Sequence, residues 1–435
     1  MALAHKTGVI VIGAGFTGLS AAYEIARKGV AVTVLEAEDH VGGLAAAFDV
    51  GGQRLERFYH HWFTNDADVM QLIDELGLTH LVEVNPTNTG MYYANSFFRL
   101  STPWDLLKFT PLSLIDRIRL GLLALRARRI EHWRMLESKS AHEWLHELGG
   151  ANVYRVVWKP LLEGKFGPYA EKVSAVWFWN KLKLRGGSRG RGGEERLAYL
   201  KGGFVQIAEV LALRIRSLGG RVELNVPVTC VEPDGGGWKA TTPRGVVSGD
   251  KIVVTTALPI AADMIRGWAQ ADYVKRLERI HYIGNVCLVL ELDRSLSETY
   301  WLNVNDPGFP FVGVIEHTNF ERAETYAGKH IVYLSKYLPC SDPLYSMSAD
   351  ELLDYAFPHL QKMFPALERN WITKHHLWKA AYSQPVVEKH YSALIPPEDG
   401  PSAGFHICSM AQIYPEDRGT NYAIRAGRKI GRRLV

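Results

Sequence analysis

The stretch 8–43 constrains the fold of this chain more than any other. A β-branched run leads into the motif G-x-G-x-x-G at Gly13, Gly15 and Gly18, a helical stretch follows, and a second apolar run ends at Glu36. Glycines there permit a tight turn, close approach of a pyrophosphate and close helix–strand packing, and the helix N-terminus attracts the phosphates. An acid at the position of Glu36 suits a ribose hydroxyl. The segment predicts a βαβ unit that binds a non-phosphorylated adenosine dinucleotide. The alternative, a glycine-rich turn in an ordinary α/β domain, leaves the acid unexplained.

Length and composition set outer limits. At 435 residues, with 47% hydrophobic and 22% charged residues, the chain exceeds one ordinary core and predicts two interleaved domains. A net charge of +4 is far below the basic excess of nucleic-acid-binding proteins, so we expect no such partner. The four cysteines are scattered, without histidines at metal spacing, which predicts a reducing, cytoplasmic location and no metal site. We expect neither a signal peptide nor a transmembrane helix.

The residues after Glu36 indicate which dinucleotide binds. An acidic turn leads to the glycine pair Gly42-Gly43. This stretch resembles the extended FAD signature of the superfamily of amine oxidases, protoporphyrinogen oxidases and phytoene desaturases. The resemblance implies that the pair lets the chain pass close to the flavin end of FAD, and the absence of the cysteine motif for covalent attachment implies that FAD is held non-covalently. The family's usual basic residue and threonine are missing beside this turn, where Leu44 and residues 45–47 stand.

Two later stretches match the same superfamily. Residues 221–231 resemble its adenine-side strand, in which the backbone of a valine, here Val228, holds the adenine. Residues 405–427 resemble its C-terminal flavin motif, a strand, a loop and a helix whose first amides face the flavin and stabilise its reduced anion. The predicted cofactor contacts are Gly13, Gly15, Phe16, Thr17, Gly18, Glu36, Ala37, Gly42, Gly43, Val228, Asp417, Gly419, Thr420 and Asn421.

One further segment carries a candidate catalytic histidine. Residues 56–66 resemble the segment of UDP-galactopyranose mutases that has a flavin-facing histidine before Thr-Asn-Asp. When the Thr-Asn-Asp at 64–66 is aligned, His60 takes that position and Phe63 replaces a second histidine. A histidine beside a flavin can stabilise negative charge or move a proton. The alternative is that His60 and His61 are structural histidines in an aromatic turn.

Candidate substrate contacts come from two regions. The basic, glycine-rich stretch 181–196 can hold a phosphate or carboxylate with arginine forks, for which we name Arg185 and Arg189. A solvated loop is the alternative. Before the last motif, Tyr382 and Tyr391 take positions that supply aromatic walls beside the flavin in the superfamily. We name Tyr382 as a catalytic residue and Tyr391 as a substrate contact, although core packing explains both.

The stretch 102–134 combines many leucines and isoleucines with interspersed arginines. An apolar helix face flanked by arginine suits peripheral contact with a membrane, and the stretch resembles in position the membrane-contacting region of protoporphyrinogen oxidases. A helical subdomain that packs on the rest of the protein is the alternative.

These features predict an α/β fold with a discontinuous, Rossmann-type FAD-binding domain. It would comprise residues 1–66, 204–258 and 400–435. A sheet-based substrate domain would comprise residues 67–203 and 259–399, with a helical subdomain at 101–150.

The resemblance implies an FAD-dependent oxidoreductase that takes a hydride from a C–H bond of a small-molecule substrate, by desaturation or oxidation. Residues 280–292 have no lysine where amine oxidases carry one near the flavin, and Cys287 lies nearest to that place, which argues against a simple amine oxidase. One alternative is a mutase that uses reduced flavin as a nucleophile on a nucleotide sugar. Another is a flavin-bound, non-catalytic carrier of a lipid or anionic ligand.

Overall fold

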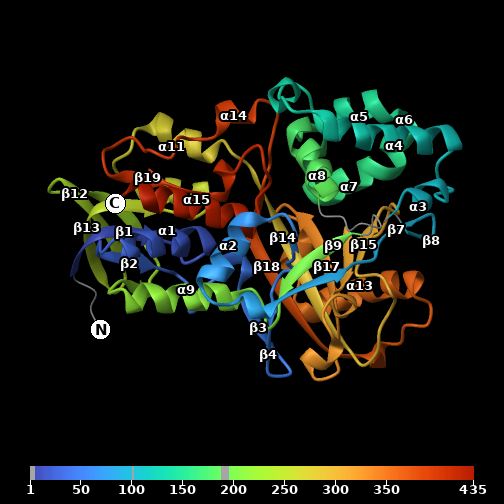
Figure 1. Ribbon diagram of the computed structural model, residues 1–435, viewed down its shortest axis with the longest axis horizontal. Helices are drawn as coiled ribbons and strands as arrows, with labels where there is room; N and C mark the ends of the chain where they lie inside the picture. Colours follow the sequence, from blue (N-terminus) through green and yellow to red (C-terminus); the bar gives the residue numbers. More distant parts are fainter. Residues whose placement is uncertain (1–4, 100–101, 188–194) are drawn as a thin grey trace.

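A mostly parallel sheet forms one half of the molecule (Figure 1). The computed structural model describes residues 5–99, 102–187 and 195–435. The sheet order is β10 (Arg221–Glu223), β2 (Val32–Leu35), β1 (His5–Ile12), β13 (Gly245–Val254), β12 (Gly237–Thr242) and β11 (Cys230–Asp234), with β19 (Phe405–Ile407) paired in parallel to β13. Strands from the beginning, middle and end of the chain therefore share one sheet.

Side-chain alternation along β1 explains why both faces of this sheet are covered. Val9 and Val11 pack into the core below α1 (Phe16–Arg27), α9 (Val205–Ser217) and α15 (Thr420–Arg433). Ile10 and Ile12 pack on the other face, in the core that includes α10 (Leu258–Ile265) and adjoins α11 (Ala271–Glu278). A strand that is buried on both faces reads as a continuous apolar run, which is how the first residues of the motif read in the sequence.

A second, larger sheet forms the other half of the molecule. Its order is β18 (Ile372–Pro385), β14 (Tyr282–Leu292), β17 (His330–Leu338), β16 (Gly313–Glu316), β15 (Trp301–Val304), β7 (Thr89–Tyr93) and β8 (Ser96–Arg99). Along β14, Val286 and Leu288 pack under α13 (Ala349–Met363), next to α12 (Pro343–Ser346), whereas Cys287 and Val289 pack into the core shared with the first sheet. The face of this sheet that carries Cys287 and Val289, opposite to α13, is thus directed at the centre of the molecule.

Small elements join the two sheets. β3 (Ala47–Val50) pairs with β4 (Gln53–Glu56), and β9 (Arg196–Leu200) lies between β5 (Trp62–Phe63) and β6 (Val82–Pro86). α2 (Ala67–Glu75) follows β5, and α14 (Tyr391–Leu394) precedes β19.

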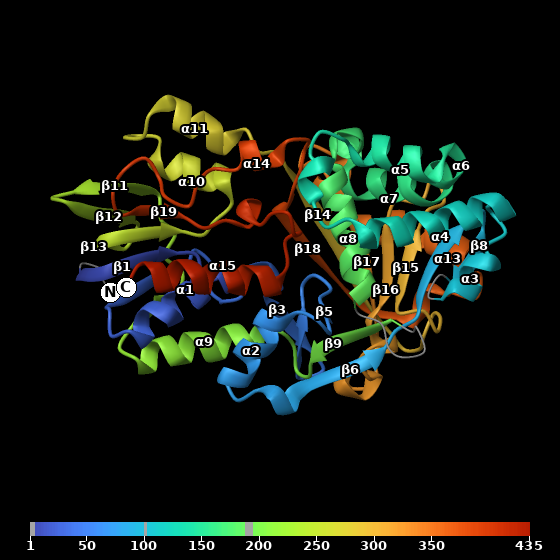
Figure 2. The same ribbon diagram turned by 45° about the horizontal axis from the view of Figure 1, so that its top comes forward.

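Helices cover the end of the larger sheet (Figures 1 and 2). They are α3 (Pro103–Leu107), α4 (Leu114–Arg129), α5 (Ala141–Gly149), α6 (Ala151–Val153), α7 (Lys159–Phe166) and α8 (Ala175–Gly187). The helices continue well beyond residue 150, where we expected them to end. Within the described ranges, no helix is both long and apolar enough to span a membrane.

Two local expectations differ from the structure. The stretch expected as one adenine-side strand is divided: β10 ends at Glu223, Asn225 has a positive φ of 56°, and β11 begins at Cys230. The amides of Asn225 and Val226 donate to the carbonyls of Glu38 and Glu36, so the chain crosses the sheet edge here instead of continuing as a strand. The stretch from residue 181, considered as a basic loop, begins as the last turns of α8.

Candidate functional site

Two helices begin at the same place in the molecule. α1 and α15 lie side by side (Figure 2) because glycines of α15 remove the side chains that would separate them. A Cβ on Gly427 would lie 2.2 Å from the carbonyl oxygen of Thr17, and one on Gly431 would lie 2.5 Å from that of Ala21. The residue numbers rise together, so the helices run parallel and their N-termini point the same way.

Both N-termini are left without a side-chain cap. Gly15 and Gly419 are the N-cap residues, neither helix has a capping side chain, and neither has an acid in its first turn. Free amide groups and two positive dipole ends therefore meet in one region, which favours bound anionic groups.

A cavity of about 800 Å³ opens at these N-termini. Its wall includes the turn between β1 and α1, the glycine pair Gly42-Gly43 and the helix start at Gly419. A Cβ on Gly15 would meet nothing within 4 Å, and a Cβ on Gly43 would lie 3.3 Å from Cα of Gly15. Backbone without side chains on this wall allows a pyrophosphate to approach closely, so the residues present fit the predicted FAD.

Most of the predicted cofactor residues line this cavity. The structure places there Gly13, Gly15, Phe16, Thr17, Glu36, Ala37, Gly42, Gly43, Val228, Gly419 and Thr420. The carboxylate of Glu36 accepts hydrogen bonds from the amides of Ala14, at 2.6 Å, and Glu38, at 3.0 Å, which fixes its position at the end of β2.

Three predicted cofactor residues lie elsewhere. A Cβ on Gly18 would lie 1.9 Å from the carbonyl oxygen of Gly13, so this glycine serves close packing of α1 on the turn. Asp417 and Asn421 line a second cavity, and Oδ1 of Asn421 accepts a hydrogen bond from the amide of Val69 at 3.0 Å.

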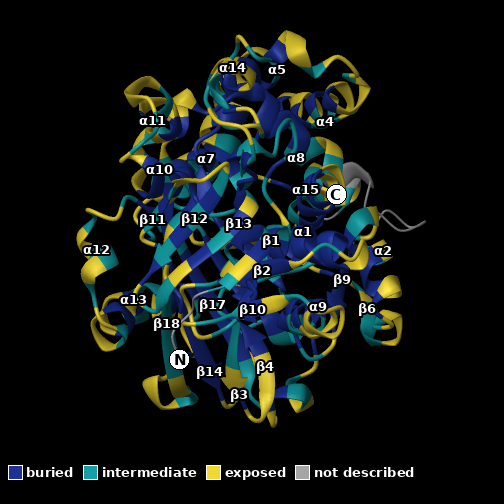
Figure 3. Cartoon of the chain, turned by 90° about the vertical axis from the view of Figure 1, so that its left-hand side faces the viewer, coloured by how far each residue is buried: buried dark blue, intermediate teal, exposed yellow. Residues whose placement is uncertain are grey.

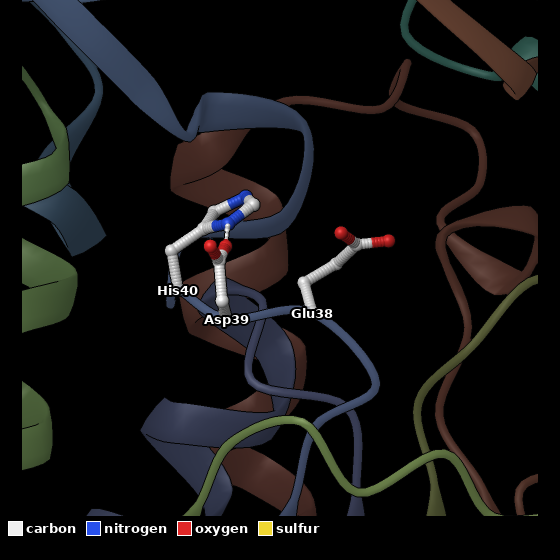
Figure 4. Close-up of side chains that lie close together, drawn as sticks. All are labelled: Glu38, Asp39 and His40. Carbon is white, nitrogen blue, oxygen red and sulfur yellow. Dashed lines mark hydrogen bonds and ion pairs between the residues drawn. The ribbon is translucent and has the colours of Figure 1, made fainter.

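Four basic residues that no sequence motif marked line the first cavity, namely His40, Arg57, Lys379 and Arg418. Figure 4 shows His40 in the turn after β2, bonded to Asp39, with Glu38 beside them. Although these three residues bring ligand atoms within 4.8 Å of one another, the guanidinium of Arg57 is hydrogen-bonded to His40, and a cation there disfavours a metal. Arg57 thus places a basic group near the turn at Gly42-Gly43. The sequence lacks the superfamily's usual basic residue beside that turn. No local motif marks Arg57, since it comes from the segment after β4.

The second cavity has a volume of about 350 Å³, and residues of α7 and α8 form part of its wall. Its walls are rich in aromatic and aliphatic side chains, namely Phe58, Tyr59, Trp62, Phe63, Trp158, Leu161, Leu162, Trp177, Phe178, Leu182, Leu184, Trp301 and Tyr337. It shares wall residues with the first cavity, namely Leu44, Phe58, His60, Arg418, Gly419 and Thr420. The two cavities therefore meet at the N-terminus of α15.

His60 lies on the shared wall. Its Nδ1 is 2.5 Å from the carbonyl oxygen of Phe58, and a carbonyl can only accept, so Nδ1 carries the proton and Nε2 of the neutral ring is an acceptor. Burial lowers the pKa of His60 to about 4, against the effect of this hydrogen bond. The neighbouring His61 also lines the second cavity and has its Nδ1 3.1 Å from the hydroxyl of Tyr300.

A cluster of charges forms one corner of the second cavity. Asp417 is buried, and its carboxylate lies 2.5 Å from Nζ of Lys181 and 4.0 Å from Nζ of Lys165. Burial alone would raise the pKa of Asp417, but Lys181, Lys165 and Arg418 together hold it well below its usual value. Arg418 donates to Oε1 of Gln384 at 2.9 Å and to the hydroxyl of Tyr337 at 3.2 Å.

On β14, Asn285 lines the second cavity. Cys287, which we expected nearest to the place of the amine oxidase lysine, is fully buried in the core, and burial raises its pKa far above the usual range. Asn285 lies two residues earlier on the same face of the strand. Its Nδ2 donates to Oγ of Ser335 at 3.0 Å.

The remaining predicted residues divide between site and core. Tyr382 lines the first cavity and forms an edge-to-face pair with Tyr282. Tyr391 is fully buried, donates to the carbonyl of Ala411 at 2.9 Å and lines neither of these cavities, which favours the packing interpretation. Arg185 belongs to α8, and Arg189 falls outside the described residues.

Comparisons with known proteins agree with this geometry. The family described as flavin containing amine oxidoreductase matches residues 16–434. A 15-cis-phytoene desaturase from Narcissus pseudonarcissus is 23% identical over 384 residues, which cover 82% of this chain and 66% of the relative. The chain spans less than two thirds of the first curated relatives it matches.

Solved structures show the same fold. A putative protoporphyrinogen oxidase from Exiguobacterium sp. 255-15 superposes with a TM-score of 0.77 at 17% identity, over 100% of this chain and 99% of that one. Reduced UDP-galactopyranose mutase superposes with a TM-score of 0.70 at 15% identity, over 89% of this chain and 86% of that one. The resemblance predicted from the glycine motifs is thereby confirmed.

Proposed function

The chain belongs to the family described as flavin containing amine oxidoreductase, and we propose that it is an FAD-dependent oxidoreductase that removes a hydride from a C–H bond of a molecule bound in the second cavity. The observation that carries this proposal is the wall shared by the two cavities, with His60 on it. A substrate in the second cavity would meet bound FAD at this shared wall.

Different residues would bind FAD, accept the proton and enclose the substrate. FAD would be held by the amides that begin α1 and α15, by Glu36, and by the backbone at Gly43 and Val228; when bound, it supplies the hydride acceptor. The neutral ring of His60 leaves Nε2 as an acceptor, which would take the proton lost beside the hydride. The aromatic walls orient the substrate and exclude water from it.

The reaction class within the family is open to experiment. The curated relatives include both a 15-cis-phytoene desaturase and a flavin-containing amine oxidase, so their names do not separate the two reactions. This chain has Asn285 on the cavity wall in the strand where we expected an amine oxidase to place lysine, which favours oxidation of a carbon–carbon or carbon–oxygen bond over oxidation of an amine.

Spectroscopy of purified protein tests the proposal. We expect non-covalent FAD whose absorbance bleaches anaerobically when a substrate is added, without any other reductant. The His60→Asn variant should keep FAD and reduce it about 10²- to 10⁴-fold more slowly, since general-base catalysis contributes that much. A flavin that no candidate alcohol, amine or alkene reduces would contradict the proposal.

The nucleotide-sugar mutase is the second candidate, because residues 60–66 contribute His60, Phe63 and Asp66 to the second cavity. A mutase would need flavin reduced beforehand and would return it in the same state after turnover. Conversion of a nucleotide sugar only after dithionite treatment would favour this candidate over net oxidation.

We also propose peripheral membrane contact through α3 and α4. Ile115, Ile118, Leu122 and Leu125 recur at heptad spacing along α4 and are exposed, Ile115 by 65%, and Trp104 of α3 is 72% exposed. Figure 3 shows exposed turns on α4. Arginines flank this apolar stripe at positions 117, 119, 126, 128 and 129, so the surface complements an anionic membrane.

A further inference from the structure

We propose that the second cavity selects an apolar substrate that carries an anionic group, a carboxylate or a phosphate, bound at the corner formed by Lys165, Lys181 and Arg418. This inference depends on the proposed function only in taking the second cavity as the substrate site. Arginines of the stretch 185–196, named from the sequence, are not needed for it.

The charges on the wall favour an anion. Among the described lining residues, the cations are Lys165, Lys181 and Arg418, and the carboxylates are Asp66 and Asp417. Asp417 is held in its ionised form by the surrounding cations, whereas burial raises the pKa of Asp66. The wall therefore carries at least one excess positive charge, which increases as Asp66 takes up a proton.

At the charged corner the carboxylates already accept hydrogen bonds, and the other acceptors on this wall include Nε2 of His60 and Oδ1 of Asn285, which lie apart from the lysines. The carboxylate of Asp417 already accepts from Lys181 and from Nε2 of Gln384 at 3.1 Å, and the carboxylate of Asp66 accepts from the amide of Phe63 at 3.0 Å. Lysine has three donor hydrogens and no acceptor, so Lys181 can bind a second oxygen while it remains paired with Asp417.

Unpaired polar atoms buried behind this wall are of both kinds. Nε1 atoms of Trp62, Trp158 and Trp177 and Oδ1 of Asn285 have no hydrogen-bond partner among the described residues, and all four residues line the cavity. The preference for an anion therefore depends on the charged side chains and not on these buried atoms.

The position of the corner fits one orientation of the substrate. Arg418 lines both cavities, whereas Lys165 and Lys181 line only the second. Lys165 also lies over the rings of Trp177 and Tyr337, at 5.1 and 5.2 Å. An anionic end held by the two lysines leaves the apolar body among the aromatic side chains, between this corner and His60.

Binding of four probes that share one apolar body tests the inference without turnover. FAD-loaded protein is titrated with 2-naphthoate, 2-naphthyl phosphate, 2-naphthalenemethanol and 2-naphthalenemethylamine, and binding is measured by calorimetry and by the change in flavin absorbance. We expect at least one anion to bind about tenfold or more tighter than the alcohol, and the amine to bind weakest. The tighter anion identifies the group as carboxylate or phosphate.

Matched lysine variants locate the selectivity. Lys165→Met and Lys181→Met should each lower the affinity for the favoured anion about tenfold, and leave the alcohol unaffected. Lys183→Met is the control. Lys183 is exposed on α8, the helix that carries Lys181, and lies over the ring of Trp179, which does not line the cavity. Equal affinity of the wild-type protein for the amine and the anions would overturn the inference, even if the lysine variants fail to fold. Failure of the proposed oxidation would appear separately, as a flavin that bound substrates never reduce.

Discussion

Nη1 of Arg57 lies 3.0 Å from Nε2 of His40 on the wall of the cofactor cavity. The guanidinium donates, so Nε2 of His40 is the acceptor and its Nδ1 is the donor to Asp39. The same guanidinium lies 4.4 Å from the ring centre of Trp378. The turn after β2, the residue that follows β4, and β18 thus meet at the guanidinium of Arg57, beside the predicted FAD site.

This relationship predicts that Arg57→Met weakens FAD binding. Nε of Arg57 is buried without a partner among the described residues, and a charged hydrogen bond contributes about 1.5–3 kcal/mol, or roughly 10- to 100-fold in Kd. Fluorescence titration of apoprotein with FAD measures the effect. Arg54→Met is the control, since Arg54 is exposed and paired with Glu209. Equal FAD affinity of the two variants would refute this role.

Gly427→Ala should separate α1 from α15. The added Cβ would lie 2.2 Å from the carbonyl oxygen of Thr17, and overpacking of this kind costs about 1–3 kcal/mol. Chemical denaturation of apoprotein should show this loss of stability, together with weaker FAD binding because two helix N-termini move apart. The control Gly267→Ala adds a Cβ with nothing within 4 Å and should change neither property. If Gly427→Ala behaves like the control, the close packing does not position the cofactor site.

Glu56 should make stability fall with rising pH. Burial raises its pKa from 4.5 to about 7, although the amide of Phe204 and the hydroxyl of Tyr199 donate to it. The folded state therefore holds a proton that the unfolded state has released, and the stabilisation is lost as the pH rises from about 4.5 to about 7. Denaturation curves across this pH range should show the slope.

Glu56→Gln should flatten that slope, because glutamine keeps an acceptor for Phe204 but does not titrate. Glu298→Gln serves as control, since Glu298 is exposed, and its curve should follow that of the wild-type protein. An unchanged slope in Glu56→Gln would assign the pH dependence to other groups.

His60 should not titrate near neutral pH. With a pKa lowered to about 4 by burial, the imidazole is neutral above about pH 5 and its acceptor Nε2 is available throughout the neutral range. Rates of flavin reduction by substrate should show no inflection from His60 between about pH 5.5 and 8. An inflection near the ordinary histidine value of about 6.5 that disappears in His60→Asn would show that the ring is exposed to water in the working enzyme.

Ile118→Glu should weaken binding to anionic vesicles. The change places a charge in the middle of the exposed stripe on α4, where Ile118 is 53% exposed, and removes buried apolar area on the membrane. Co-sedimentation with phosphatidylglycerol vesicles measures the effect. Leu213→Glu on α9 is the control, because Leu213 is similarly exposed on a different part of the molecule. If both variants sediment like the wild-type protein, or if Ile118→Glu changes only the oligomeric state, the stripe has another partner.

The sequence by itself determined the βαβ unit that begins the cofactor half of the protein. Gly13, Gly15 and Gly18 are required by local backbone geometry, and Glu36 follows at the distance set by one helix and one strand. Such constraints operate within about thirty residues, so a reader of the sequence can place them. The Val228 and Gly419 positions followed from resemblance and also line the cavity.

Only the tertiary structure decided which other residues reach the site. Arg57, Asn285 and Lys165 carry no motif, and they line the cavities because separate segments fold against one another there. Asp417, predicted as a cofactor contact, lines the second cavity with Lys181, a residue 236 positions earlier in the chain. Tyr391, equally aromatic in the sequence, lies in the core. Whether a polar or aromatic residue serves a site or the core depends on contacts between distant segments, and local patterns of residues do not encode those contacts.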